Sequence, residues 1–136
     1  MVSSAYLLSI SDHADECEQD LQELQKRLTE GHWSRFDELA AERSLQVLIE
    51  AAIGIAKHWA KETTGQTQHE ALASFNCLAE QGLIGSSIPW KKMIGLRNAL
   101  VHDYLVVDVE IVQSVISQEY YRQPLCFIRS AVSALR

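Results

Sequence analysis

The chain has 136 residues, the usual length of one domain, and 47% of them are hydrophobic, which is enough for one sizeable core. Six glycines and two prolines provide few turn signals, so the composition favours a few long helices over many short strands. A net charge of −6 excludes nucleic-acid binding through overall charge. We therefore expect one helical domain over residues 1–136.

The charge is unevenly distributed along the chain. Residues 1–80 hold 6 basic and 14 acidic side chains, a net charge of −8, whereas residues 81–136 hold 6 basic and 4 acidic ones, a net charge of +2. If the chain binds nucleic acid, the second part is therefore the one expected to do so, through a local basic rim. The candidates for this rim are Lys91, Lys92, Arg97, Arg122 and Arg129.

Cysteine usage and hydropathy bear on the compartment of the protein. Cys17, Cys77 and Cys126 are odd in number, far apart and set in apolar segments, which predicts three buried thiols in a reducing environment. The N-terminus lacks the basic and apolar regions of a signal peptide, and no stretch approaches the roughly 18 apolar residues of a membrane span. We expect a cytoplasmic protein without a membrane partner.

Apolar residues at helical spacing predict the first two helices. One spans about residues 4–29, and the other, the longest, spans about residues 34–63. Gly54 lies in the middle of the second helix, where glycine costs about 0.5–1 kcal/mol relative to alanine. Another segment, either a neighbouring helix or a second subunit, should therefore pack closely at Gly54.

The middle of the chain predicts two shorter helices. The first spans about residues 68–81. Ser87 should cap the next one, with Pro89 in its first turn, where proline is tolerated.

The C-terminal part predicts a helix and a break. Asp108, with Glu110 behind it, predicts an N-cap and a helix to about residue 122, and Pro124 should separate it from a last helix. Together the elements predict an all-α fold: an antiparallel bundle of four main helices with short C-terminal helices.

The most informative segment is the octapeptide at residues 97–104, Arg-Asn-Ala-Leu-Val-His-Asp-Tyr. It places a guanidinium (Arg97), an imidazole (His102) and a phenol (Tyr104) in an apolar run where folding alone would favour leucine and alanine. Arginine forks onto phosphate, and histidine gives and takes protons near neutral pH. These groups together provide what phosphodiester cleavage needs in the absence of a metal.

An ideal helix would not bring all these side chains together. Asn98 and His102 would share one face, whereas Arg97 and His102 would be about 140° apart around the axis. Three arrangements would bring the last two together: the long arginine side chain sweeps round, the helix loosens before His102, or the pair forms across two subunits.

Each group has a candidate role in RNA cleavage, in which the ribose 2′-hydroxyl attacks its neighbouring phosphate. His102 would act as general base or general acid, and Arg97 would stabilise negative charge in the transition state. Tyr104 would bond a phosphate or stack on a base. Asn98 would hold the imidazole or a phosphate oxygen.

The pattern Arg97-x4-His102-x-Tyr104 resembles the signature of HEPN-superfamily ribonucleases, and most closely that of the HepT-type toxins. The resemblance covers about residues 4–120. The sequence departs from the family pattern just before the octapeptide. Gly95 and Leu96 stand there, where an aromatic residue is common in the family. The other matching segments are residues 42–58, 75–82 and 93–98.

The resemblance implies a HEPN-like bundle that forms a homodimer and brings two motifs into one cleft. It implies metal-independent endoribonuclease activity, without a cofactor, in the toxin of a toxin–antitoxin pair. It also implies a partner, a small nucleotidyltransferase-fold antitoxin that neutralises the toxin by adding AMP to Tyr104. The added nucleotide would bring phosphate charge to Arg97 and block the cleft.

Other interpretations of these residues stay open. The alternative function is a non-catalytic HEPN module that binds a nucleotide, RNA or a partner protein, with Arg97 as an anion contact. A partly buried Glu50 would need a partner such as Arg43. The histidine and cysteine spacings predict no metal site. The three tryptophans are expected to anchor the core or an interface.

Overall fold

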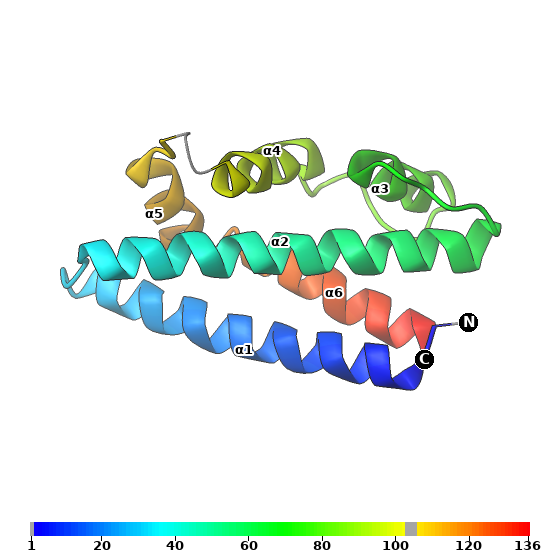
Figure 1. The fold of residues 1–136 in the computed structure, drawn as a ribbon, viewed down its shortest axis with the longest axis horizontal. Helices are drawn as coiled ribbons and strands as arrows, with labels where there is room; N and C mark the ends of the chain where they lie inside the picture. The colour runs from blue at the N-terminus through cyan, green and yellow to red at the C-terminus, as the bar shows by residue number, and fades with distance from the viewer. Residues whose placement is uncertain (1, 103–105) are drawn as a thin grey trace.

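The computed structural model describes residues 2–102 and 106–136, and six helices make up the regular structure of these residues (Figure 1). Helix α2 runs the length of the molecule, with α1 and α6 on one side of it and α3 and α4 end to end along the other. The expected all-α bundle is therefore confirmed. The helices are α1 (Ser4–Thr29), α2 (Arg35–Thr64), α3 (Ala71–Glu80), α4 (Trp90–Val101), α5 (Val109–Ser117) and α6 (Arg122–Leu135).

The turn between α1 and α2 is fixed by a capping box and an ion pair. The Ser34 hydroxyl accepts a hydrogen bond from the Asp37 N–H, and the Asp37 carboxylate accepts one from the Ser34 N–H. Arg27 of α1 donates two bonds to the same carboxylate. The Arg27 guanidinium and the Ser34 donors hold the pKa of Asp37 well below its usual range. The start of α2 is thus tied to the end of α1.

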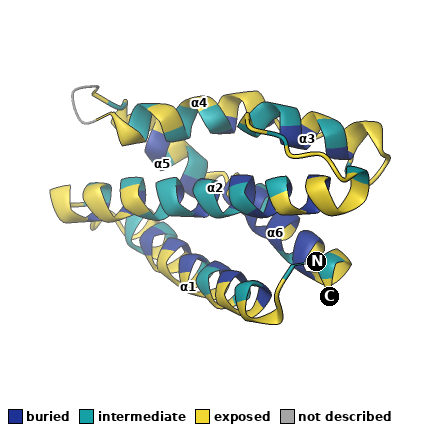
Figure 2. Ribbon diagram, turned by 45° about the vertical axis from the view of Figure 1, so that its right-hand side comes forward, coloured by how far each residue is buried: buried dark blue, intermediate teal, exposed yellow. Residues whose placement is uncertain are grey.

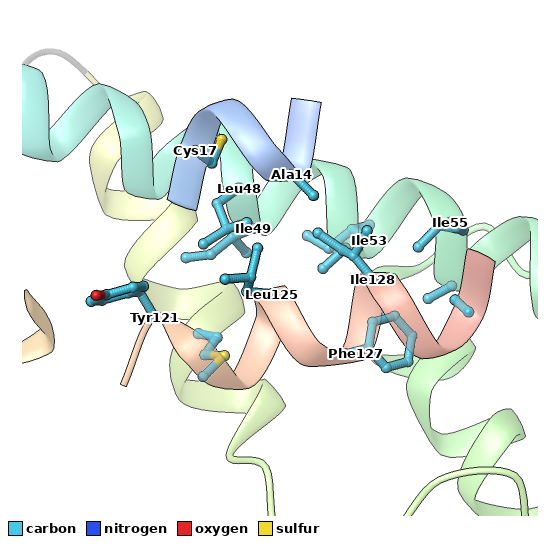
Figure 3. Packing of buried hydrophobic residues seen from close by; sticks show 14 of the residues in the cluster. Ala14, Cys17, Leu48, Ile49, Ile53, Ile55, Tyr121, Leu125, Phe127 and Ile128 are labelled. Atoms are coloured by element: carbon cyan, nitrogen blue, oxygen red, sulfur yellow. The ribbon is translucent and has the colours of Figure 1, made fainter. Parts of the chain in front are cut away.

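The main core lies where α2 meets α1 and α6 (Figure 3). Leu48 and Ile55 of α2 and Ile128 of α6 are fully buried, and Ala14 of α1 is 1% exposed. The predicted stripe of α1 supplies the facing residues. Its buried members are Leu7, Ile10, Ala14, Cys17, Leu21 and Leu24.

Gly54 of α2 faces Tyr6 of the neighbouring helix α1 without an unusually close approach. A Cβ atom at Gly54 would lie 3.6 Å from the hydroxyl oxygen of Tyr6 in α1. The Tyr6 ring also packs on the His58 ring, with 4.6 Å between the ring centroids. Because 3.6 Å is an ordinary van der Waals distance, α1 alone does not require a glycine at position 54, and packing of a second subunit there stays a prediction.

An aromatic cluster anchors the start of α4. Trp90, the first residue of α4, stacks on Phe75 of α3 with the ring centroids 3.7 Å apart, and Phe127 of α6 meets the Trp90 ring edge-on at 4.9 Å. Trp59 of α2 lies 6.0 Å from Phe127. Aromatic side chains of three other helices, α2, α3 and α6, therefore fix this end of α4.

Two predicted boundaries around the prolines are wrong. Helix α4 begins at Trp90, and Ser87 does not cap it, because the residue before Pro89 is disfavoured in the helical region. The break between α5 and α6 falls at residues 118–121, where Glu119 has a φ of 59°. Pro124 instead lies in the first turn of α6, where its missing N–H costs no helical bond.

The expectation of three buried thiols is also wrong. Cys17 is buried, Cys77 is partly buried and Cys126 is exposed. Cys126 lies on the outer side of α6, a face that the spacing of apolar residues did not separate from the inner one. In the described ranges, no helix combines the length and the apolar character needed to cross a bilayer.

Candidate functional site

The motif lies at the end of α4 and in the connection that follows it. Figure 2 shows this end of α4 in the colours of exposed and half-buried residues, away from the dark blue core between α1, α2 and α6. Arg97 is partly buried in the second half of α4. The rigid start of α4 and the exposed end together present the motif at the surface.

Asn98 holds the side chain of Arg97. Its Oδ1 atom accepts a hydrogen bond from Arg97 Nε, with the two atoms 2.9 Å apart. This bond uses the Nε atom, and the two Nη atoms can still form a fork onto a phosphate. The expected role of Asn98 at the imidazole or at a phosphate oxygen stays a prediction, and in this chain its side chain bonds Arg97.

Helix α4 ends before His102. His102 is the C-cap residue, with φ −87° and ψ 98°, so its backbone has left the helix, and the residue is exposed. The helix therefore loosens before His102, as in one of the three arrangements considered, and the pairing of Arg97 with His102 across two subunits stays a prediction. The shared face predicted for Asn98 and His102 does not apply, because that prediction assumed a helix through residue 102.

Tyr104 and its neighbours 103 and 105 lie outside the described residues, so its role stays a prediction. The chain is described again from Val106, which is 98% exposed. Asp108 then caps α5 as predicted, since its Oδ1 accepts a bond from the Glu110 N–H at 2.9 Å. The motif thus begins within α4, which is anchored at its start, and it ends before α5, which Asp108 caps.

The predicted basic rim is only partly present. Lys91 and Lys92 are exposed on the first turn of α4. Arg129 instead donates to Asp15 and Glu18 of α1 at 2.9 Å each, which raises the pKa of Arg129. Arg122 donates to Glu18 of α1 and to Glu119, three residues before it. These two arginines therefore form ion pairs between α1 and α6, which reduces the positive charge that they would bring to an RNA rim.

Glu50 has a different partner from the one expected. Its Oε1 atom accepts a hydrogen bond from Gln46 Nε2 at 2.9 Å, one helical turn away on α2. The proposed pairing with Arg43 is not observed among the described residues. A neutral amide therefore meets the need of this half-buried carboxylate.

The residues that carry metal-binding chemistry do not gather. Among residues 2–102 and 106–136, no three histidine, cysteine or acidic side chains are placed to hold a metal ion. His13 and Cys17 come within 3.7 Å, but burial raises the pKa of the Cys17 thiol to about 11. Cys17 is therefore a core thiol whose ionisation is disfavoured by its burial.

Sequence comparison identifies the family. A model of the HepT-like ribonucleases matches residues 14–125. The chain belongs to the HepT-like ribonuclease family. A curated relative, the mRNA nuclease HepT of Shewanella oneidensis, is 37% identical over 75 residues, which are 54% of this chain and 56% of that protein. The match thus spans little more than half the length of the relative.

Solved structures share the HEPN-like fold. The HEPN toxin of Shewanella oneidensis, solved in tri-AMPylated form with its MNT antitoxin, matches with a TM-score of 0.78 and 25% identity over 93% of this chain and 98% of that one. A toxin–antitoxin complex with AMP-PNP gives 0.76 and 25% over the same shares. A mutant MntA–HpeT toxin–antitoxin complex gives 0.79 and 26% over 93% and 97%. The resemblance to the HEPN toxins is confirmed.

Proposed function

We propose that this chain is a metal-independent endoribonuclease that acts as the toxin of a toxin–antitoxin pair. One observation carries the proposal: in a chain of the HepT-like ribonuclease family, Arg97 and His102 stand at the exposed end of a rigidly anchored helix. An exposed imidazole five residues after a guanidinium that Asn98 holds suits a substrate as large as RNA, which cannot enter a closed cavity.

The proposed reaction is a transesterification. A general base removes the proton of a ribose 2′-hydroxyl, and that oxygen forms a bond to the adjacent phosphorus. The bond from phosphorus to the 5′-oxygen of the next nucleotide breaks, and a general acid gives this leaving oxygen a proton. The products are a 2′,3′-cyclic phosphate and a 5′-hydroxyl. His102 exchanges the proton, and Arg97 stabilises the charge that develops on the phosphate oxygens.

The proposal includes a homodimer. One motif supplies one imidazole, whereas the reaction uses a base and an acid at once. Two copies related by a twofold axis would supply both from two His102 side chains. Lys91 and Lys92 are proposed to contact phosphates beside the scissile one, as exposed ammonium groups on the same helix as Arg97.

The proposed regulator is a nucleotidyltransferase-fold antitoxin that adds AMP to Tyr104. This is supported by the related HEPN toxin, which was solved tri-AMPylated with its MNT antitoxin. Intact-mass measurement after incubation with the antitoxin and ATP tests it. We expect the mass of added AMP on the wild-type chain and none on Tyr104→Phe; an adduct on Tyr104→Phe would show that another residue is modified.

Cleavage in the presence of EDTA tests the enzyme itself. Purified wild-type protein should cleave RNA in EDTA and leave a 2′,3′-cyclic phosphate. His102→Ala should lose about 10²–10⁴-fold in rate, the usual contribution of a general acid or base. His69→Ala is the matched control, because His69 is an exposed histidine that lies before α3 and outside the motif.

Two results would contradict the proposal. Equal growth arrest from the wild type and from His102→Ala would remove His102 from the mechanism. RNA binding without cleavage by the wild type would favour the non-catalytic binding module instead.

A further inference from the structure

A cavity of about 640 Å³ lies beside the motif, and of the residues given a role in RNA cleavage or binding only Lys92 lines it. It opens between α4, α5 and the start of α6, with α2 beneath it. Its size falls within the 300–1,000 Å³ usual for sites that bind small molecules. The apolar part of its lining includes Leu45 and Ile49 of α2 and Met93 and Leu96 of α4.

The cavity adjoins the proposed catalytic groups along the chain. Leu96 lines it and directly precedes Arg97, and Asp108 lines it at the far end of the connection that begins with His102. Lys92, also in the lining, is five residues before Arg97, or about 7.5 Å along the helix axis. That is about two steps of a stacked nucleic-acid strand, at roughly 3.4 Å each.

The polar lining suits a base better than a phosphate. The carboxylates of Asp108 and Glu110 would repel a phosphate, but they accept hydrogen bonds from amino groups of bases. The Ser114 hydroxyl lies on the same wall. Lys92 is the cation of the lining, and it would balance the phosphate of a nucleotide whose base enters the cavity.

Two further side chains point to a ligand. Gln123 lines the cavity, and its buried Oε1 atom has no hydrogen-bond partner among the described residues. A buried acceptor left without a donor is unusual in folded proteins, and a donor brought by a ligand would explain it. Tyr120 also lines the cavity and is 50% exposed, so its ring is available for stacking on a base.

We propose that this cavity is a nucleobase subsite that holds a base of the RNA next to the scissile phosphate. It takes a base with an exocyclic amino group, namely adenine, cytosine or guanine. Uracil is disfavoured because it would turn carbonyl oxygens toward Asp108 and Glu110. The inference rests on the proposed function, since it takes RNA as the substrate, and it adds a source of sequence preference to that function.

The test measures the binding of short RNAs that cannot be cleaved. Tetranucleotides with 2′-O-methyl groups, which lack the attacking hydroxyl, would carry cytosine or uracil at one position. Fluorescence anisotropy gives their affinity for the full chain. The wild type should bind the cytosine form about tenfold or more tightly than the uracil form, a difference of the size expected for a bonded base edge.

Two variants, each with a control, test whether the cavity causes the preference for cytosine over uracil. Ser114→Leu fills it and should weaken binding of the cytosine form about tenfold, whereas Ser117→Leu, on the same helix but outside the lining, should stay within about twofold. Glu110→Gln should reduce the preference for cytosine over uracil, because an amide also donates. Glu16→Gln, an exposed glutamate on α1, is its control. Thermal melts check that each variant is folded.

The outcomes separate this inference from the proposed function. Base-selective binding without any cleavage contradicts the ribonuclease and supports the subsite. Cleavage by the wild type, with Ser114→Leu equal to Ser117→Leu in binding, overturns the subsite alone. If Ser114→Leu instead weakens self-association or antitoxin binding and leaves RNA affinity unchanged, the cavity is a protein-docking site and the proposal is wrong.

Discussion

Arginine has different partners in two regions of the molecule. One region is the body of the bundle, formed by α1, α2 and α6, and the other is the motif end, residues 97–102 with Val106. In the body, arginines of α1 and α6 meet carboxylates: Arg27 meets Asp37, and Arg129 meets Asp15 and Glu18. At the motif end, Arg97 bonds the neutral amide of Asn98, and no described carboxylate forms an ion pair with it. A guanidinium held by a neutral partner keeps its charge available for an anionic substrate.

The two regions also differ in how they are held. The body is fixed by side chains with almost no exposed surface, such as Leu48 and Ile128, whereas the motif end carries Val101, Val106 and His102 at the surface. Substitutions in the body should therefore change stability, and substitutions at the motif should change activity. Variants in the two regions test that separation, beginning with the largest expected effect.

The largest effect should come from Ile128→Ala. Ile128 is fully buried in α6 against α2, so the variant should lose about 2–5 kcal/mol of unfolding free energy through lost burial and a new cavity. Val106→Ala is the control, since Val106 is 98% exposed and should stay within about 0.5 kcal/mol. Urea unfolding gives both values. Similar losses from the two variants would show that the motif end is packed in solution.

Exchanging two arginines for alanine should give opposite results. Arg97→Ala should lower the rate of RNA cleavage about 10²–10³-fold without changing the thermal midpoint, because it removes a donor that acts in the transition state. Arg129→Ala should keep the cleavage rate and lose roughly 1 kcal/mol or less of stability, since its ion pairs are largely at the surface.

Arg97→Lys sharpens this comparison. It keeps the charge but loses the fork that binds two phosphate oxygens, so its rate should fall between those of the wild type and Arg97→Ala. A loss of stability in Arg97→Ala equal to that in Arg129→Ala would assign Arg97 to the fold.

Long helices could be predicted because their signals agree. The bounds of α1 match the predicted residues 4–29, since its buried stripe repeats over many turns and a cap precedes it. The short C-terminal elements were harder because local signals compete. Ser87 is a good capping residue by type, but Pro89 excludes its neighbour from the helix. Pro124 predicts a helix break by its residue type, but it lies in the first turn of α6, where proline is tolerated.

The sequence predicts which residues form the candidate site, but it does not predict how they are arranged in space. The motif is continuous in sequence, so Arg97 and His102 were found together. Whether an arginine meets an acid is decided by residues far away in the chain: Arg129 bonds Asp15 across 114 positions. The cavity likewise needs α2, α4, α5 and the start of α6 together. No spacing in one segment carries that information.

A smaller effect should follow from Ser34→Ala, at the junction that ties α1 to α2. The variant loses the side chain that accepts from the Asp37 N–H, and with it about 0.5–2 kcal/mol of stability. Ser9→Ala is a matched control: Ser9 is exposed within α1, where alanine is the better helix former. Chemical unfolding of both compares them. Equal stabilities would mean that Arg27 and the other contacts of Asp37 fix the turn without the cap.

The smallest predicted effect is a dependence on pH in the body of the bundle. Hydrogen bonds from Arg129 lower the pKa of the Glu18 carboxyl, and the charge of Arg129 and the contact with Arg122 act in the same direction. Burial raises this pKa, but the net shift is downward. A carboxyl with a lower pKa in the folded state stabilises the fold above its unfolded pKa, about 4.3, and this contribution is lost as the pH falls through the folded value. Glu18→Gln should therefore be less stable than the wild type at pH 7, by roughly 1 kcal/mol or less, and the difference should shrink by pH 3. Unfolding free energies at the two pH values measure it. A difference that stays constant would mean that Glu18 acts through packing, and the contrast between neutralised arginines in the body and an available Arg97 at the motif would then rest on Asp15 and Asp37 alone.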